Sequence, residues 1–211
     1  MKKIILILIM MLSLFSCSSH NKLTVFLGNN MYSYTSYLKE NNNNINDTFS
    51  MQKGYISYLY SMVAQDGSDL ISNKKISSII KKSNRIIIQI GNEEVLRCLE
   101  KENDVYIIND SFFQTQKELY SYYYFLLLEE IRNIYNGEII ILSPYLEIED
   151  YFLLGNIDEV LSSFYDIAQE VSVYFSCLFI DIRSISLFVE NNTITQNGYE
   201  HLNKVIESGI R

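Results

Sequence analysis

Short polar segments follow the apolar runs of this sequence, and their residue types limit the chemistry that they can perform. Gly28-Asn29-Asn30 follows the first run, Gly91-Asn92-Glu93 follows a middle run, and Glu190-Asn191-Asn192-Thr193 lies near the C-terminus. Their amide, carboxylate and hydroxyl groups can hydrogen-bond to a ligand. An asparagine cannot be activated as an alkoxide nucleophile, and a threonine cannot act as a general base near neutral pH. These segments therefore favour ligand binding over covalent catalysis.

Alternating strands and helices are predicted to position these segments. Five apolar runs are predicted as strands, at residues 23–27, 61–64, 85–90, 138–142 and 178–182. Helical periodicity is found at 70–82, 116–134, 157–174 and 199–206. The runs Ile86-Ile87-Ile88 and Ile139-Ile140-Ile141 are continuous and β-branched, which is typical of parallel strands buried on both faces. The pattern predicts an α/β sandwich whose polar segments gather at the carboxyl edge of the sheet.

Together these segments resemble the sequence blocks of the SGNH (GDSL-type) hydrolases, especially the secreted lipase- and esterase-like proteins of Gram-positive bacteria. In that family Gly-Asp-Ser follows the first strand, a glycine follows the second, Gly-x-Asn-Asp follows the third, and Asp-x-x-His precedes a Gly-Tyr that opens the last helix. Gly198-Tyr199 stands at that last place here. The resemblance spans residues 23–206 and implies a flavodoxin-like three-layer α/β/α sandwich with a mostly parallel five-stranded sheet.

The resemblance also assigns residues to the family's site. The positions of the nucleophile, oxyanion glycine, oxyanion asparagine, acid and base are occupied, in that order, by Asn30, Gly67, Glu93, Glu190 and Thr193. If the loop after the third strand is one residue shorter, Asn92 takes the oxyanion position instead of Glu93. The domain is therefore expected to have lost its catalytic serine and histidine, and to bind a small molecule or an envelope protein at the old cleft.

Two other functions stay open at this point. One is an active esterase or lipase with rearranged catalytic residues, for which Ser33 with His201 is the candidate pair. The second histidine, His20, lies close to the expected lipid anchor. The other is an unrelated α/β lipoprotein with an interaction role.

The first residues have the pattern of a bacterial lipoprotein signal peptide. Lys2 and Lys3 precede an apolar run at 4–15, which as a helix would span about 18 Å, short of the hydrocarbon core of about 30 Å. Leu14-Phe15-Ser16-Cys17 resembles a lipobox, which implies cleavage before Cys17 and acylation of Cys17, for example with palmitate. We expect a signal peptide at 1–16, a lipidated tether at 17–22, a domain at 23–211, and export to the bacterial cell membrane or envelope.

Composition and charge exclude several classes of protein. With 8 Gly and 1 Pro in 211 residues, the chain is neither collagen-like nor a Pro-rich linker, and an all-β sandwich is disfavoured. A formal net charge of −8 gives no electrostatic reason to bind nucleic acid. The sequence has no CxxC and no zinc-ligand spacing, so neither a metal nor a cofactor is expected.

Three remaining groups of residues each have two interpretations. Cys98 and Cys177 can form one disulfide in an exported protein or stay as buried thiols. An acidic group is expected in a solvated loop, with a cation site as the alternative: Glu147, Glu149 and Asp150. A group of tyrosines is expected to pack half-buried on a helix, with a partner surface as the alternative: Tyr120, Tyr122, Tyr123 and Tyr124.

Overall fold

The computed structural model of the chain describes residues 24–28, 34, 37, 48–50, 74–102, 105–149 and 157–210. The expected signal peptide, the tether and the strand at 61–64 lie outside these residues. Within the described part, no helix is long and apolar enough to cross a membrane. Nor does that part bring together three or more His, Cys, Asp or Glu side chains that could hold a metal ion.

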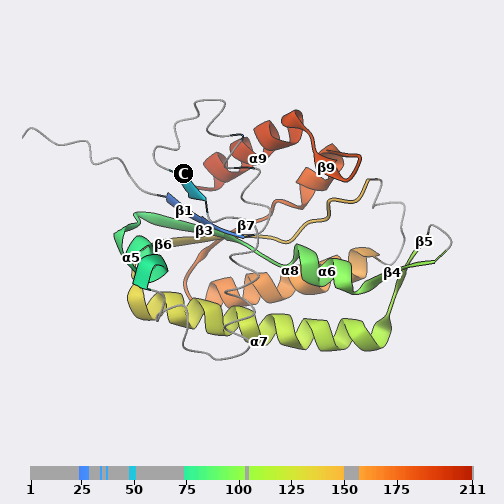
Figure 1. The fold of residues 1–211 in the computed structure, drawn as a ribbon, viewed down its shortest axis with the longest axis horizontal. Helices are drawn as coiled ribbons and strands as arrows, with labels where there is room; N and C mark the ends of the chain where they lie inside the picture. The colour runs from blue at the N-terminus through green and yellow to red at the C-terminus, as the bar shows by residue number, and fades with distance from the viewer. Residues whose placement is uncertain are drawn as a thin grey trace, which may run out of the picture.

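A five-stranded parallel sheet forms the centre of the fold (Figure 1). Its strand order is β2-β1-β3-β6-β7, and all neighbouring strands are parallel. The strands are β1 (Thr24–Leu27), β2 (Thr48–Ser50), β3 (Arg85–Gln89), β6 (Glu138–Leu142) and β7 (Leu178–Ile180). This order, with helices on both faces, confirms the predicted flavodoxin-like α/β/α sandwich.

The second strand differs from the prediction. The strand that pairs with β1 is Thr48–Ser50, with Thr24 opposite Thr48 and Phe26 opposite Ser50. The predicted strand at 61–64 lies outside the described residues. Thr48-Phe49-Ser50 contains a single apolar residue and pairs on one side only within the described sheet. An edge strand of this kind does not need the continuous apolar run by which buried strands are recognised.

Helices cover the two faces of the sheet. In Figure 1, α9 (Gln196–Gly209) lies on one side of the sheet, while α7 (Asp110–Ile134) and α8 (Ile157–Tyr174) lie on the other. The remaining helices are α5 (Lys74–Lys82), α6 (Asn92–Arg97) and the short 3-10 helix η2 (Arg183–Phe188). Two hairpins complete the described part: β4 (Leu99–Glu102) with β5 (Val105–Ile108), and β8 (Val189–Glu190) with β9 (Thr193–Ile194).

Helix α7 begins six residues before the predicted start at 116, and its cap explains why. The Asn109 side chain accepts a hydrogen bond from the backbone N–H of Phe112, at 3.2 Å. An asparagine in this position satisfies one of the free N–H groups of the first turn. The apolar periodicity on which the prediction depended starts only after this capped turn.

Two hydrophobic cores use alternate residues of the central strands. Ile86 and Ile88 of β3 pack in the cluster that includes residues of α7 and α8, whereas Ile87 packs in the cluster on the α9 side. All three side chains are at most 1% exposed. Burial on both faces is the reason why the isoleucine runs are continuous rather than alternating.

The two described cysteines are free thiols. Cys98 is buried, and its Sγ donates a hydrogen bond to the carbonyl of Glu94 at 3.1 Å. Burial, with a smaller contribution from the nearby Glu94 carboxylate, raises the pKa of the Cys98 thiol to about 11. The disulfide alternative is therefore not found in this structure.

Candidate functional site

The carboxyl ends of β1 and β3 approach each other very closely. Gly28, directly after β1, has φ of 143°, and a Cβ atom at this position would lie 1.9 Å from the carbonyl oxygen of Gln89. Gly91, just after β3, has φ of 115°. Both conformations are strained for residues with side chains. The two glycines therefore let the polar segments after β1 and β3 begin at the same narrow point of the sheet edge.

The Asn92 side chain is buried at this edge and is held by two hydrogen bonds. Its Oδ1 accepts from the backbone N–H of Tyr145 at 2.9 Å and from Nε2 of Gln89 at 2.7 Å. A backbone N–H can only donate, so this contact identifies the atom that it reaches as the amide oxygen. The Asn92 Nδ2 group must then be the free end of the amide.

The Asn92 Nδ2 group has no hydrogen-bond partner within the described structure, although it is shielded from solvent. The residue is 7% exposed. A buried donor without a partner costs about 1–3 kcal/mol. Such a group at the carboxyl edge of a parallel sheet is suited to donate to an oxygen atom of a bound ligand.

Glu93 does not occupy this position. It belongs to the first turn of α6, and its carboxylate lies 3.8 Å from the Arg97 guanidinium, one helical turn later. Both side chains are substantially exposed to solvent. The structure thus places Glu93 on the exposed side of α6, while Asn92, the alternative for the oxyanion position, is buried at the sheet edge.

Glu190 and Thr193 face each other across the tight hairpin of β8 and β9. They form a cross-strand pair, and the Thr193 hydroxyl donates to the Glu190 carbonyl at 2.9 Å. The two residues between them, Asn191 and Asn192, have φ of 50° and 56°. Positive φ at both central positions is the type I′ turn that suits a two-residue hairpin. The four-residue block is therefore a compact hairpin that exposes Glu190 and Thr193.

One loop connects this hairpin with Asn92. The segment after β6 contributes Tyr145 N–H to Asn92, and four residues later Glu149 binds the hairpin. The Glu149 N–H donates to Oδ1 of Asn192 at 3.3 Å, and Asn191 N–H donates to the Glu149 carboxylate at 3.2 Å. Glu149 therefore holds the hairpin turn. This gives it a structural role that neither the solvated-loop nor the cation-site interpretation includes.

Several predicted site residues lie outside the described part, namely Asn30, Gly67, Ser33, Cys17 and His20.

His201 has a partner that the sequence did not indicate. Its Nε2 lies 2.8 Å from the Ser184 hydroxyl, and its ring stacks on Phe188 with a centroid distance of 4.9 Å. Ser184 and Phe188 both belong to η2, which packs against α9. The described structure thus places His201 beside Ser184 of the 3-10 helix. No sequence signal could have shown this contact between separate helices.

Solved structures with a similar fold include hydrolases. They include the lipase Lip_vut3 from a goat rumen metagenome, with a TM-score of 0.64 and 15% identity over 89% of this chain and 97% of that chain. The hydrolase LAE5 from the metagenome of Lake Arreo, Spain, has a TM-score of 0.59 and 12% identity over 90% and 94% of the two chains. The acetylxylan esterase Axe2 of Geobacillus stearothermophilus has a TM-score of 0.55 and 12% identity over 91% of this chain and 94% of that chain.

The chain has the fold of these hydrolases. At such low identities the likeness shows the fold alone. No family profile matches the sequence, and neither does any curated protein. The activity of the site therefore has to be argued from its own residues.

The two hydrogen bonds that Asn92 Oδ1 accepts should contribute measurably to the free energy of unfolding. Asn92→Ala leaves the Tyr145 N–H and the Gln89 amide without their acceptor, so we expect a loss of about 2–4 kcal/mol in the free energy of unfolding. Asn92→Asp keeps an acceptor oxygen for both donors and should lose clearly less. Urea denaturation of the three proteins measures this difference. Equal stability of Asn92→Ala and the parent would show that these bonds do not hold the loop after β6.

Proposed function

We propose that this protein is a lipid-anchored bacterial envelope protein whose hydrolase-like domain binds an acylated ligand without hydrolysing it. The observation that carries the proposal is the buried, unpartnered Nδ2 group of Asn92 at the carboxyl edge of the sheet. A carbonyl oxygen of an ester or acetyl group is the acceptor that would satisfy this donor. The similarity to lipases and an acetylxylan esterase supports the choice of an acylated ligand.

The residue types at the site argue against turnover. Thr193, at the place of the family's histidine, has no basic nitrogen, and its hydroxyl already donates to a backbone carbonyl. Asn30, at the place of the serine, cannot form an acyl-enzyme. A serine hydrolase without its triad retains about 10³–10⁴-fold acceleration over water, from the oxyanion donors and from binding. This remainder is too small for a working esterase.

The anchor is proposed on the lipobox-like segment that ends in Cys17. Acylation with more than one chain provides stable membrane attachment without a membrane-spanning helix. Strand β1 begins at Thr24, so the tether joins the sheet at the amino end of this strand. Asn92 follows the carboxyl end of the neighbouring parallel strand β3. The proposed site therefore lies at the edge of the sheet opposite to the amino end of β1.

Binding of an acylated ligand should depend on the Asn92 donor. We expect the full-length protein to bind an acetylated xylo-oligosaccharide. The Asn92→Asp variant should bind it at least about tenfold more weakly, because a carboxylate replaces the amide that donates the hydrogen bond. Isothermal titration calorimetry measures both affinities, with the deacetylated oligosaccharide as control ligand. Equal binding of the acetylated and deacetylated sugars would contradict a role of the acyl oxygen.

Hydrolysis should be weak and restorable. We expect the parent protein to hydrolyse p-nitrophenyl acetate with at most the residual acceleration of a serine hydrolase that lacks its triad. The double substitution Asn30→Ser with Thr193→His should raise this rate by about 10²-fold or more, because it returns a nucleophile and a base. Neither single substitution should do so. Robust turnover by the parent, abolished by His201→Ala, would instead establish the active esterase with rearranged residues.

Membrane attachment should depend on Cys17. In the native bacterium we expect the parent protein in the membrane fraction with labelled palmitate incorporated, and Cys17→Ala without label and released from the membrane. Cys98→Ala is the matched control and should behave as the parent does. Label on the Cys17→Ala protein would contradict this anchor, whatever the outcome for ligand binding.

A further inference from the structure

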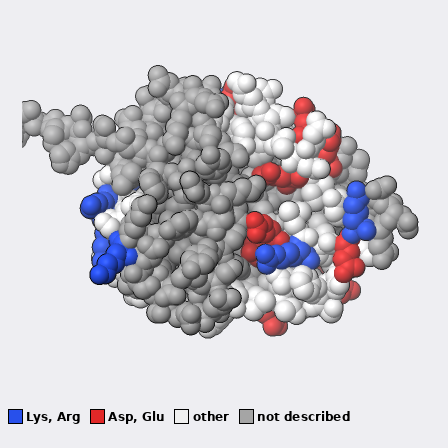
Figure 2. Space-filling model, viewed as in Figure 1, with Lys and Arg blue, Asp and Glu red and all other residues white. Residues whose placement is uncertain are grey.

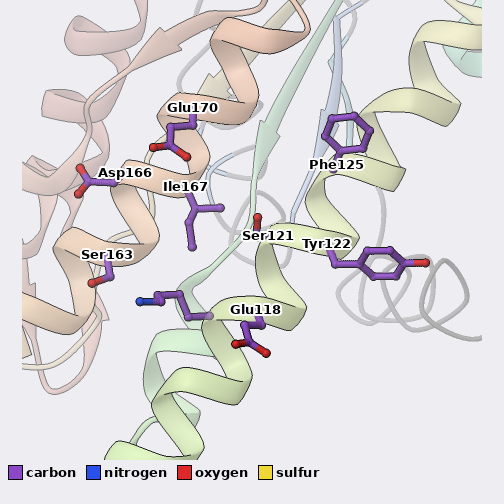
Figure 3. Close-up of a pocket in the computed structure, with 9 residues that line it drawn as sticks. Glu118, Ser121, Tyr122, Phe125, Ser163, Asp166, Ile167 and Glu170 are labelled. Carbon is purple, nitrogen blue, oxygen red and sulfur yellow. The ribbon is translucent and has the colours of Figure 1, made fainter.

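A groove between α7 and α8 lies apart from the Asn92 site. Its volume is about 700 Å³, and Figure 3 shows its lining side chains coming from these two helices, with Ile167 between them. Helix α7 contributes Lys117, Glu118, Ser121, Tyr122 and Phe125, and α8 contributes Ser163, Asp166, Ile167 and Glu170. The groove therefore belongs to the helical layer on one face of the sheet, not to the carboxyl edge.

The floor and one end of the groove are apolar and aromatic. Phe125 and Ile167 are half-buried in the floor. The Phe125 ring packs against Tyr174 and Phe175, with centroid distances of 4.9 Å to each. Tyr122 at the rim is 59% exposed, and Tyr174 at the end of α8 is 70% exposed. Large exposed rings beside an apolar groove indicate a surface that is covered by a partner.

The groove has a net negative charge: its α8 side carries two acids, and its α7 side carries Glu118 beside Lys117. Glu118 lies on α7, while Asp166 and Glu170 lie one turn apart on α8. Like charges at this spacing destabilise a helix slightly. Within the described residues none of the three carboxylates has an ion pair, and the Nζ of Lys117 lies over the Phe113 ring, 5.5 Å from its centroid. The negative charge of the walls is thus available to a positively charged partner.

This charge distinguishes between the occupants that an apolar groove can have. A second copy of the chain would bring its own Glu118, Asp166 and Glu170 against the same residues, and an anionic membrane surface would also be repelled. Over the described part of the face shown in Figure 2, acidic and basic side chains are interspersed, in a protein of net charge −8. The combination of an aromatic floor with acidic walls favours a partner that is both basic and apolar.

We propose that this groove binds a basic amphipathic helix of a partner protein. The partner's apolar residues, at helical spacing, would contact Phe125 and Ile167. Its lysine or arginine side chains would lay their aliphatic parts along Tyr122 and place their charged ends at Glu118, Asp166 and Glu170. The proposal is independent of the ligand at Asn92, because it uses other residues on another part of the fold.

The probe for this proposal is a fluorescent synthetic helix of about 18 residues, with leucine on one face and lysine elsewhere. We expect the full-length protein to bind it in an anisotropy titration, and more weakly at high salt because the charges are screened. The double substitution Asp166→Asn with Glu170→Gln should weaken binding at least about tenfold. Tyr122→Ser should weaken it as well. These side chains are exposed or at the rim, so circular dichroism should show unchanged folding.

Matched controls separate a real groove from general attraction to an acidic protein. Glu129→Gln with Glu200→Gln removes the same charge from exposed positions of α7 and α9 outside the groove, and it should leave the affinity unchanged. A probe with glutamate in place of lysine should not bind. The proposal would be overturned if both double variants lost the same affinity for the basic probe, or if the acidic probe bound as tightly as the basic one. If sedimentation shows that the parent is a dimer and that Tyr122→Ser is a monomer, the groove binds a second copy of the chain and the proposal is overturned.

Discussion

The amide of Asn92 is the interaction on which the arrangement of the site depends. Its oxygen receives one hydrogen bond from the end of β3 and one from Tyr145 in the loop after β6, 53 residues later in the chain. These two bonds orient the amide, and the orientation leaves its nitrogen as a buried donor. The donor is in place before any ligand arrives, so little reorganisation would be needed on binding. Under the proposed function, this donor would recognise an oxygen atom of the ligand.

The hairpin of β8 and β9 is tied to the loop after β6. Its type I′ turn, held by Glu149, keeps the block close to the loop that binds Asn92. The same block carries Thr193, whose hydroxyl donates to the Glu190 carbonyl and cannot act as a general base near neutral pH. Under the proposed function, this arrangement would allow binding without turnover.

The two surfaces of the domain follow from the layered architecture. The site lies where the parallel strands end, since only there do segments from different strands converge. The groove lies between α7 and α8, whose apolar sides pack on the sheet while Tyr122, Asp166 and Glu170 remain outside. Because the site and the groove use different residues on different parts of the fold, a small ligand and a protein partner could be bound at the same time.

Local patterns of apolar residues predict the layers of this protein, because the burial of a strand or helix leaves a local signal in the sequence. The runs Ile86-Ile87-Ile88 and Ile139-Ile140-Ile141 predicted parallel strands buried on both faces, and the structure confirms it. The short edge strand Thr48–Ser50 was missed, since a strand paired on one side carries little apolar signal. The buried position of Asn92 and the exposed position of Glu93 depend on contacts that the sequence does not show. Asn92 and Glu93 are consecutive residues at the start of α6, so their side chains point in different directions. The Asn92 side chain is buried and accepts a hydrogen bond from Tyr145, which is far away in the sequence, while Glu93 lies near Arg97.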